Sequence, residues 1–139
     1  MTFMYIVPVK IAESEIDGSG VFAERNIAVN TVAWVYKDGH DIKMTPAEFD
    51  ALPRSRKSSL RNTGYLSPWS GLWIFPPEND PAQFTNHSPD NNLSAVYDSG
   101  VSPEPYFVAN KNIKAGTELT NNYLEFDNIT RQTKPAWAK

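Results

Sequence analysis

Residues 84–92 read FTNHSPDNN, a polar stretch in which Phe84 is the one apolar side chain and the expected anchor. The stretch holds His87, one of two histidines in the chain, and a histidine in a polar loop can serve as a general base or a metal ligand. The other histidine, His40, lies far away in sequence, and no spacing resembles a zinc motif. Ser88 follows His87 directly, and adjacent residues rarely converge as a catalytic pair. Taken alone, the stretch predicts a histidine that satisfies the backbone of a loop.

The composition is typical of one globular domain. The chain has 139 residues, of which 40% are apolar and 21% charged, so it can bury a core of its own. Eleven prolines and seven glycines predict short segments joined by turns. The absence of cysteine excludes disulfide scaffolds, cysteine-based zinc clusters and thiol nucleophiles. We expect a mostly β domain over residues 1–139 with a short helical insertion.

The charge balance and the start of the chain bear on partners and location. Thirteen basic residues against sixteen acidic ones give a net charge of −3, which disfavours direct binding of nucleic acid. The first ten residues have no basic leader, and Pro8 interrupts their apolar run. No apolar run is long enough to cross a membrane. We therefore expect a soluble intracellular protein with neither a membrane nor a nucleic-acid partner.

Short apolar runs between turn residues predict the strands. These runs are Tyr5–Ile11, Val21–Ala23, Thr31–Tyr36, Leu72–Phe75, Tyr106–Ala109 and Glu118–Thr120. Asp17 and Gly18 predict a hairpin turn between the first two. The nearly continuous apolar run from Thr31 to Tyr36 predicts a strand buried on both faces.

One helix has clear boundary signals. Thr45 is a suitable N-cap, Pro46 suits the first helical position, and Glu48 completes a capping box before Pro53 ends the helix. The stretch from Arg54 to Arg61 carries four basic residues among serines. It predicts a solvated helix or loop and, secondarily, a docking patch.

Three motifs in order resemble those of the SET-domain family. They read GSGVFA at residues 18–23, FTNHSPDNN at 84–92 and IKAGTELTNNY at 113–123. The family patterns are G-x-G-x-F-A, R-F-x-N-H-S-x-x-x-N and D-I-x-x-G-E-E-L-x-Y-D-Y. Thr31–Tyr36 also resembles the strand that ends in the family's E-Y-x-G-E motif. The resemblance covers about residues 10–125, nearly the whole chain.

The resemblance implies a fold and an activity. The fold would be the β-clip SET fold, in which the last two motifs form a pseudoknot. The activity would be protein-lysine methylation with S-adenosyl-L-methionine as the donor. The partner would be a protein or peptide with an exposed lysine, histone-like and basic in view of the acidic balance of this chain. Whether the chain forms a homodimer stays open.

The resemblance also implies roles for individual residues and no metal ligand. The positions implied for the cofactor are Gly18, Ser19, Gly20, Tyr65, Gln83, Asn86, His87 and Tyr123. The positions implied for catalysis are Tyr123 and Tyr36. The positions implied for the lysine channel are Tyr36, Tyr65, Asn121 and Phe126. In this reading His87 need not be a base or a metal ligand.

Several positions depart from the family patterns. Gln83 stands where arginine is usual, and Asn122 replaces aspartate. Asn121 occupies a position where phenylalanine or tyrosine often tunes the number of methyl groups added. No cysteine-rich flank is present, so we expect the tail over residues 124–139 to close the site. Within it, Phe126 or Trp137 would cover the adenine or the lysine stem, or serve as a core anchor.

Two other functions stay open on the sequence alone. The departures at Gln83, Asn121 and Asn122 would suit a SET-like module that binds a protein or cofactor without catalysis. Trp69 and Trp73 would suit carbohydrate or peptide recognition if both indoles were exposed, although tryptophans at such positions are more often part of the core.

Overall fold

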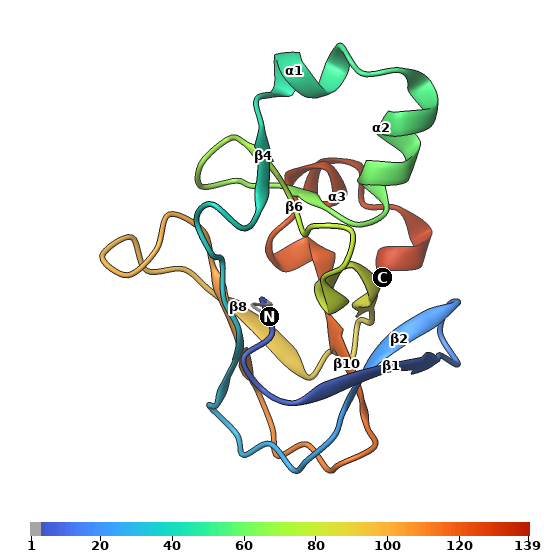
Figure 1. Cartoon of the computed structure of the whole chain (residues 1–139), viewed down its shortest axis with the longest axis vertical. Helices are drawn as coiled ribbons and strands as arrows, with labels where there is room; N and C mark the ends of the chain where they lie inside the picture. The colour runs from blue at the N-terminus through green and yellow to red at the C-terminus, as the bar shows by residue number, and fades with distance from the viewer. Residues whose placement is uncertain (1–3) are drawn as a thin grey trace.

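The computed structural model describes residues 4–139, and Met1–Phe3 at the start of the predicted domain lie outside them (Figure 1). The strands are β1 Val9–Glu13, β2 Ser19–Ala23, β3 Val32–Trp34, β4 Ile42–Met44, β5 Tyr65–Leu66, β6 Trp73–Phe75, β7 Asn86–His87, β8 Leu93–Val96, β9 Tyr106–Ala109 and β10 Glu118–Asn121. The helices are α1 Pro46–Asp50, α2 Arg54–Arg61 and α3 Asn128–Thr133, with short 3-10 turns η1 Pro81–Phe84, η2 Tyr123–Glu125 and η3 Ala136–Ala138. The prediction of a mostly β domain with a short helical insertion is confirmed.

The first sheet has the strand order β1-β2-β10-β7. β1 and β2 form the predicted hairpin, and Gly18 in its turn has a φ of 47°, a conformation that favours glycine. β10 pairs antiparallel with β2 and parallel with β7, so Thr120 lies opposite Asn86 and Asn121 opposite His87. This sheet therefore joins the three motifs of the sequence.

Two smaller sheets complete the architecture, with orders β3-β9-β8 and β4-β6-β5. In the main core, Trp34 stacks on Phe107 with ring centroids 4.1 Å apart. A second apolar cluster lies under α1 and α2, where Phe49 stacks on Trp73 at 4.2 Å. Figure 1 shows this helical insertion at the top of the molecule and the β1-β2 hairpin at the lower right.

The structure corrects three expectations from the sequence. β1 begins at Val9 rather than Tyr5, because Pro8 has no backbone N–H, and Tyr5 forms only an isolated bridge with Trp34. Pairing of the predicted strand Thr31–Tyr36 is confined to β3, Val32–Trp34, with Val35 and Tyr36 only half-buried. Phe84 is 38% exposed and is not a buried anchor, because Ala82, and not Phe84, is the residue of its 3-10 turn that packs against the core.

The capping signals of the helical insertion are confirmed. The Thr45 hydroxyl accepts from the Glu48 amide at 3.1 Å, and the Glu48 carboxylate accepts from the Thr45 amide at 2.9 Å. Residues 54–61 form a helix, α2, whose last turn buries Leu60. The last residue of α2, Arg61, donates to the Asp127 carboxylate at 2.7 Å.

Asp127 connects the helical insertion to the C-terminal tail. Its fully buried carboxylate accepts from Arg61 of α2, from the Leu66 amide of β5 and from the amide and hydroxyl of Thr130 in α3. Because burial makes an unpaired carboxylate costly, this set of donors fixes the tail in one position.

Asp41, in the loop between β3 and β4, is a buried carboxyl group with few partners. One oxygen accepts from the Lys37 amide at 3.0 Å, and within residues 4–139 the other oxygen has no hydrogen-bond partner. Burial is the main cause that raises its pKa to about 6, and the nearby carboxylates of Asp80 and Glu104 raise it further.

Asp41→Asn should therefore change the pH dependence of stability. The folded-state pKa is above the value of 3.8 for the free group, so the stability from Asp41 is present below pH 4 and is lost as the pH rises through 6. As the pH rises from 4 to 7.5, the unfolding free energy of the variant should increase by about 2–3 kcal/mol relative to that of wild type, measured by urea denaturation. The exposed Asp50→Asn is the control, and a pH-independent difference for Asp41→Asn would contradict this account.

Candidate functional site

A cavity of about 600 Å³, here called the main cavity, lies beside the junction of β7 and β10. Its walls come from distant parts of the chain: the β1-β2 turn, the end of α2, β7, Tyr123 and the tail as far as Trp137. Thr133, Pro135 and Trp137 of the tail over residues 124–139 therefore contribute a wall of this cavity.

Asn86 holds the β1-β2 turn at the edge of the main cavity. Its Nδ2 lies 3.1 Å from the Asp17 carbonyl, 3.2 Å from the Ser19 carbonyl and 2.9 Å from the Glu118 carboxylate. A Cβ on Gly20 would lie 2.3 Å from the same Glu118 carboxylate, so a larger residue there would displace this carboxylate from its present position. The turn contributes Ile16 and Asp17 to the cavity wall, whereas Gly18, Ser19 and Gly20, which follow in the chain, do not line the cavity.

His87 ties Tyr123 to the end of the chain. Its Nδ1 accepts from the Tyr123 amide at 3.1 Å, so its Nε2 carries the proton and donates to the Ala138 carbonyl at 3.1 Å. Burial lowers the pKa of the imidazole, which keeps the ring neutral. With both nitrogens engaged, His87 positions its neighbours and is not arranged as a base or a metal ligand.

Tyr123 stands between the main cavity and a narrow inner space of about 20 Å³, here called the passage. Burial is the main cause that raises the pKa of Tyr123 to about 12, so its hydroxyl is neutral at physiological pH. Within the described residues this hydroxyl has no hydrogen-bond partner. A neutral hydroxyl without a partner at the edge of a cavity can bind a ligand atom.

Aromatic side chains line the passage. Tyr65, Asn121, Tyr123 and Phe126 all contact it, so four residues predicted for the site converge there. Tyr65 and Phe126 meet edge to face, with centroids 5.2 Å apart. The Tyr65 hydroxyl donates to the buried Glu104 carboxylate at 3.1 Å, and burial raises the pKa of Tyr65 well above its usual value.

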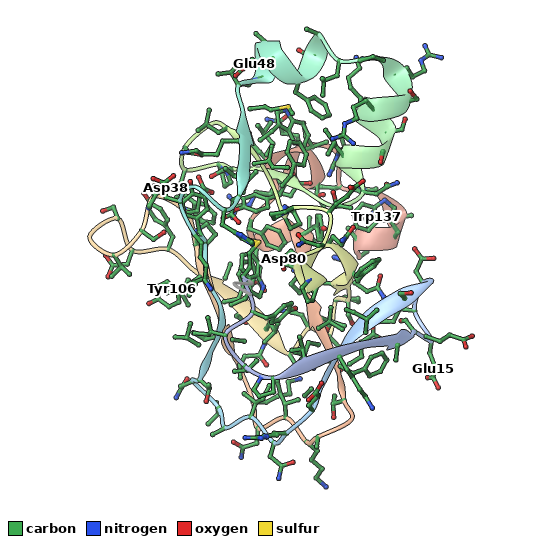
Figure 2. All side chains as sticks on the ribbon, viewed as in Figure 1. Glu15, Asp38, Glu48, Asp80, Tyr106 and Trp137 are labelled. Carbon is green, nitrogen blue, oxygen red and sulfur yellow. The ribbon has the colours of Figure 1, made fainter. Side chains whose placement is uncertain are left out.

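Tyr36 and Gln83 lie outside the main cavity and the passage. Tyr36 lines a second hollow of about 410 Å³, where it donates to Asp38 at 3.0 Å. Figure 2 shows Asp38 and Tyr106 of this hollow on the opposite side of the molecule from Trp137. The Gln83 amide donates to the Glu78 carbonyl.

The aromatic residues considered for other roles divide between core and surface. Phe126 is buried and packs against Phe107, whereas Trp137 is 56% exposed and lines the main cavity. Trp73 is buried, which removes it from any carbohydrate site. Trp69 is half-buried and stacks on Tyr97 at 4.9 Å.

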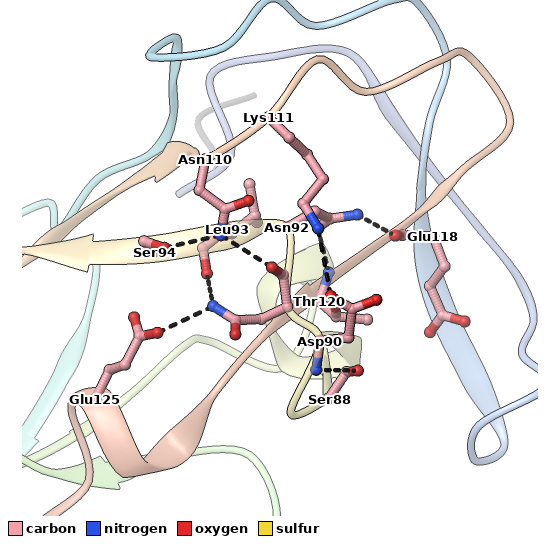
Figure 3. Close-up of polar contacts among 11 residues, drawn as sticks. Ser88, Asp90, Asn92, Leu93, Ser94, Asn110, Lys111, Glu118, Thr120 and Glu125 are labelled. Carbon is pink, nitrogen blue, oxygen red and sulfur yellow. Dashed lines mark hydrogen bonds and ion pairs between the residues drawn. The ribbon is translucent and has the colours of Figure 1, made fainter.

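A polar network around Asn92 supports the β7-β10 junction (Figure 3). Asn92 donates to the Glu118 carbonyl at 2.8 Å and accepts from the Thr120 amide at 2.9 Å, so it ties the loop after β7 to β10. Next to it, Asn91 donates to the Glu125 carboxylate at 3.0 Å. These contacts fix both ends of β10, from which Tyr123 follows.

Sequence reasoning missed the contribution of α2 to the site. Arg61 and Asn62 line the main cavity, as do Thr133 and Pro135 of the tail. The only signal for Arg61 was its place in a basic stretch, and nothing in the spacing of that stretch indicates a contact with residue 127.

Neither a membrane-spanning helix nor a metal site is found within residues 4–139. None of the helices there is long and apolar enough to span a membrane. In the same range, no three histidine or acidic side chains are grouped as a metal site.

Among protein families, the model of the SET domain matches residues 18–124, which is most of the chain. The chain belongs to the SET-domain family. Among solved structures, this SET domain is similar to a candidate histone methyltransferase from Plasmodium falciparum, with a TM-score of 0.56 and 20% sequence identity over 83% of this chain and 91% of that one. The likeness shows a shared fold. No curated protein matches the sequence.

Asn86→Ala should release the β1-β2 turn. Loss of the amide leaves the Glu118 carboxylate and two carbonyls without this donor, so we expect a destabilisation of about 1–3 kcal/mol and faster amide hydrogen exchange at residues 15–19. Asn79→Ala, at an exposed turn, is the matched control and should change neither quantity. Unaltered exchange at Ile16 and Asp17 in Asn86→Ala would show that Asn86 does not hold the turn.

Proposed function

We propose that this SET domain transfers methyl groups from S-adenosyl-L-methionine to a lysine side chain of a protein. The observation that carries the proposal is that Tyr123 forms a wall shared by the main cavity and the aromatic passage. A transfer between two large reactants requires two compartments that meet at the reacting atoms, with the reactants held in line.

The main cavity suits the donor. Exposed apolar faces of Ile16 and Trp137 flank it and would cover an aromatic base, while Asn86 and His87 supply polar edges. When bound, the donor supplies an activated methyl group on a positively charged sulfur. The unpartnered Tyr123 hydroxyl is the group of this chain that would face that methyl, through weak C–H···O contacts.

The acceptor would reach Tyr123 from the side of the second hollow. Tyr36 lines that hollow, and Tyr65 lines the passage. Aromatic walls suit the apolar stem of a lysine and can stabilise its cation. They also exclude water, which lowers the pKa of the amine and favours the nucleophilic form. Tyr36 is therefore proposed to act at the acceptor end.

The substrate class follows from charge and from the related fold. The chain has a net charge of −3, and Asp38 lies exposed beside Tyr36 in the second hollow. A basic protein segment of histone type would be favoured by this charge. The similar Plasmodium falciparum structure is of a candidate histone methyltransferase, which supports the same class.

The structure weakens one argument for an inactive module. Asn122 accepts from the Leu124 amide at 3.0 Å and caps η2, a task for which asparagine and aspartate are equally suited. Its replacement of aspartate therefore leaves the position of Tyr123 supported. Calorimetry with S-adenosyl-L-methionine separates the two functions, because absence of binding at millimolar donor would exclude the methyltransferase.

Tyr123→Phe should lower the rate of methyl transfer by about 10²-fold and leave donor affinity within about threefold. The variant removes only the hydroxyl, whereas the backbone bond to His87 and the ring contact with Phe126 remain. Transfer is measured with tritiated donor and a mixture of core histones and basic lysine peptides, and affinity by calorimetry.

Tyr97→Phe is the matched control, because Tyr97 is exposed and stacks on Trp69 away from Tyr123. It should retain the full rate. If Tyr123→Phe transferred methyl groups as fast as wild type, the role of this hydroxyl would be wrong.

A further inference from the structure

Arg61 places a positive charge in the wall of the main cavity. It is the last residue of α2, and its side chain is 28% exposed. Among the described residues that line this cavity, it is the one charged basic side chain, since the half-buried His87 has a lowered pKa and is neutral. Neither the proposed binding of adenosine nor the role of Tyr123 uses this charge.

Asp127 and Trp73 hold the Arg61 guanidinium in position. Its Nη2 donates to Asp127 at 2.7 Å, and its central carbon lies 5.6 Å from the centre of the Trp73 ring. Asp127 is itself fixed by the Leu66 amide and by Thr130. Arg61 is therefore positioned before any ligand binds, which lowers the ordering cost of binding.

Most donors of this guanidinium remain available. An arginine has five N–H donors in a rigid fork, and within residues 4–139 the structure gives a partner only to Nη2. The carboxylate of Asp127 also accepts from three neutral donors, the Leu66 amide and the amide and hydroxyl of Thr130, so its hydrogen bonding does not depend on Arg61 alone. A guanidinium in a partly enclosed wall is well suited to a planar carboxylate, which it can bind with two parallel hydrogen bonds.

We propose that Arg61 binds the carboxylate at the amino-acid end of the ligand in the main cavity. The inference rests on the proposed donor, S-adenosyl-L-methionine, whose adenosine and amino-acid ends differ in charge. It assigns the charged end of the ligand to the α2 side of the cavity. The adenosine end then lies between Ile16 and Trp137. It also gives the helical insertion a direct part in the site, through a residue that Asp127 ties to the tail.

The test compares two ligands that differ only in the carboxylate. S-adenosylhomocysteine carries it, and S-adenosyl-3-thiopropylamine lacks it but keeps the adenosine, the thioether and the amine. Arg61→Gln should lower the affinity for S-adenosylhomocysteine by about 10- to 100-fold, measured by calorimetry. The affinity for S-adenosyl-3-thiopropylamine should stay within about twofold of the wild-type value. Arg56→Gln, at an exposed position of the same helix, should alter neither affinity.

The outcomes separate the two proposals. Suppose that wild type binds S-adenosylhomocysteine. If Arg61→Gln then lowers the affinity for both ligands equally, or changes the affinity for neither, Arg61 does not bind the carboxylate. If wild type binds neither ligand, the proposed donor itself is wrong, and the inference falls with it. Arg61→Lys keeps the charge and can still pair with Asp127, so it guards against misfolding of the glutamine variant. Arg61→Lys should lose less affinity for S-adenosylhomocysteine than Arg61→Gln does. Its affinity for S-adenosyl-3-thiopropylamine should equal that of wild type.

Discussion

The parallel pairing of β7 with β10 holds the site together, because β7 carries the side chains that fix two of the walls and β10 leads to Tyr123. From β7, Asn86 fixes the β1-β2 turn and His87 fixes both the Tyr123 backbone and the Ala138 carbonyl. β10 leads directly into Tyr123, and Asn92 ties it to the loop that follows β7. The pairing spans only two residues on each strand, so its stability depends on these side-chain bonds.

Local features were predictable from the sequence, because their causes are local. The Thr45 capping box and the Gly18 turn each depend on residues within a few positions, and both are present. The order of the three motifs predicted the family, which the family comparison confirms. Tyr65, Asn121, Tyr123 and Phe126 all line the passage, whereas Tyr36 lines the second hollow, and their assignment to a lysine channel stays a prediction.

The remaining features depend on pairings between distant residues. β4 and β8 carry no strong alternation of their own and are strands because β6 and β9 lie beside them. Arg61 lines the main cavity because its hydrogen bond to Asp127, 66 residues later in the chain, fixes the end of α2 next to the tail. Gln83 has its amide on the Glu78 carbonyl, an arrangement set by the turn at Asp80 and not by any motif. Such contacts leave no periodic pattern in the sequence.

The central claim is that the main cavity receives the donor, with the tail as one of its walls. The most direct measurement is the change in backbone amide NMR shifts when the protein is titrated with S-adenosylhomocysteine. The account predicts shifts concentrated at residues 16–20, 85–88, 123 and 133–137, with little change around Val101 and Tyr106 in the second hollow. Saturable shifts confined to the second hollow, or none at millimolar ligand, would contradict it.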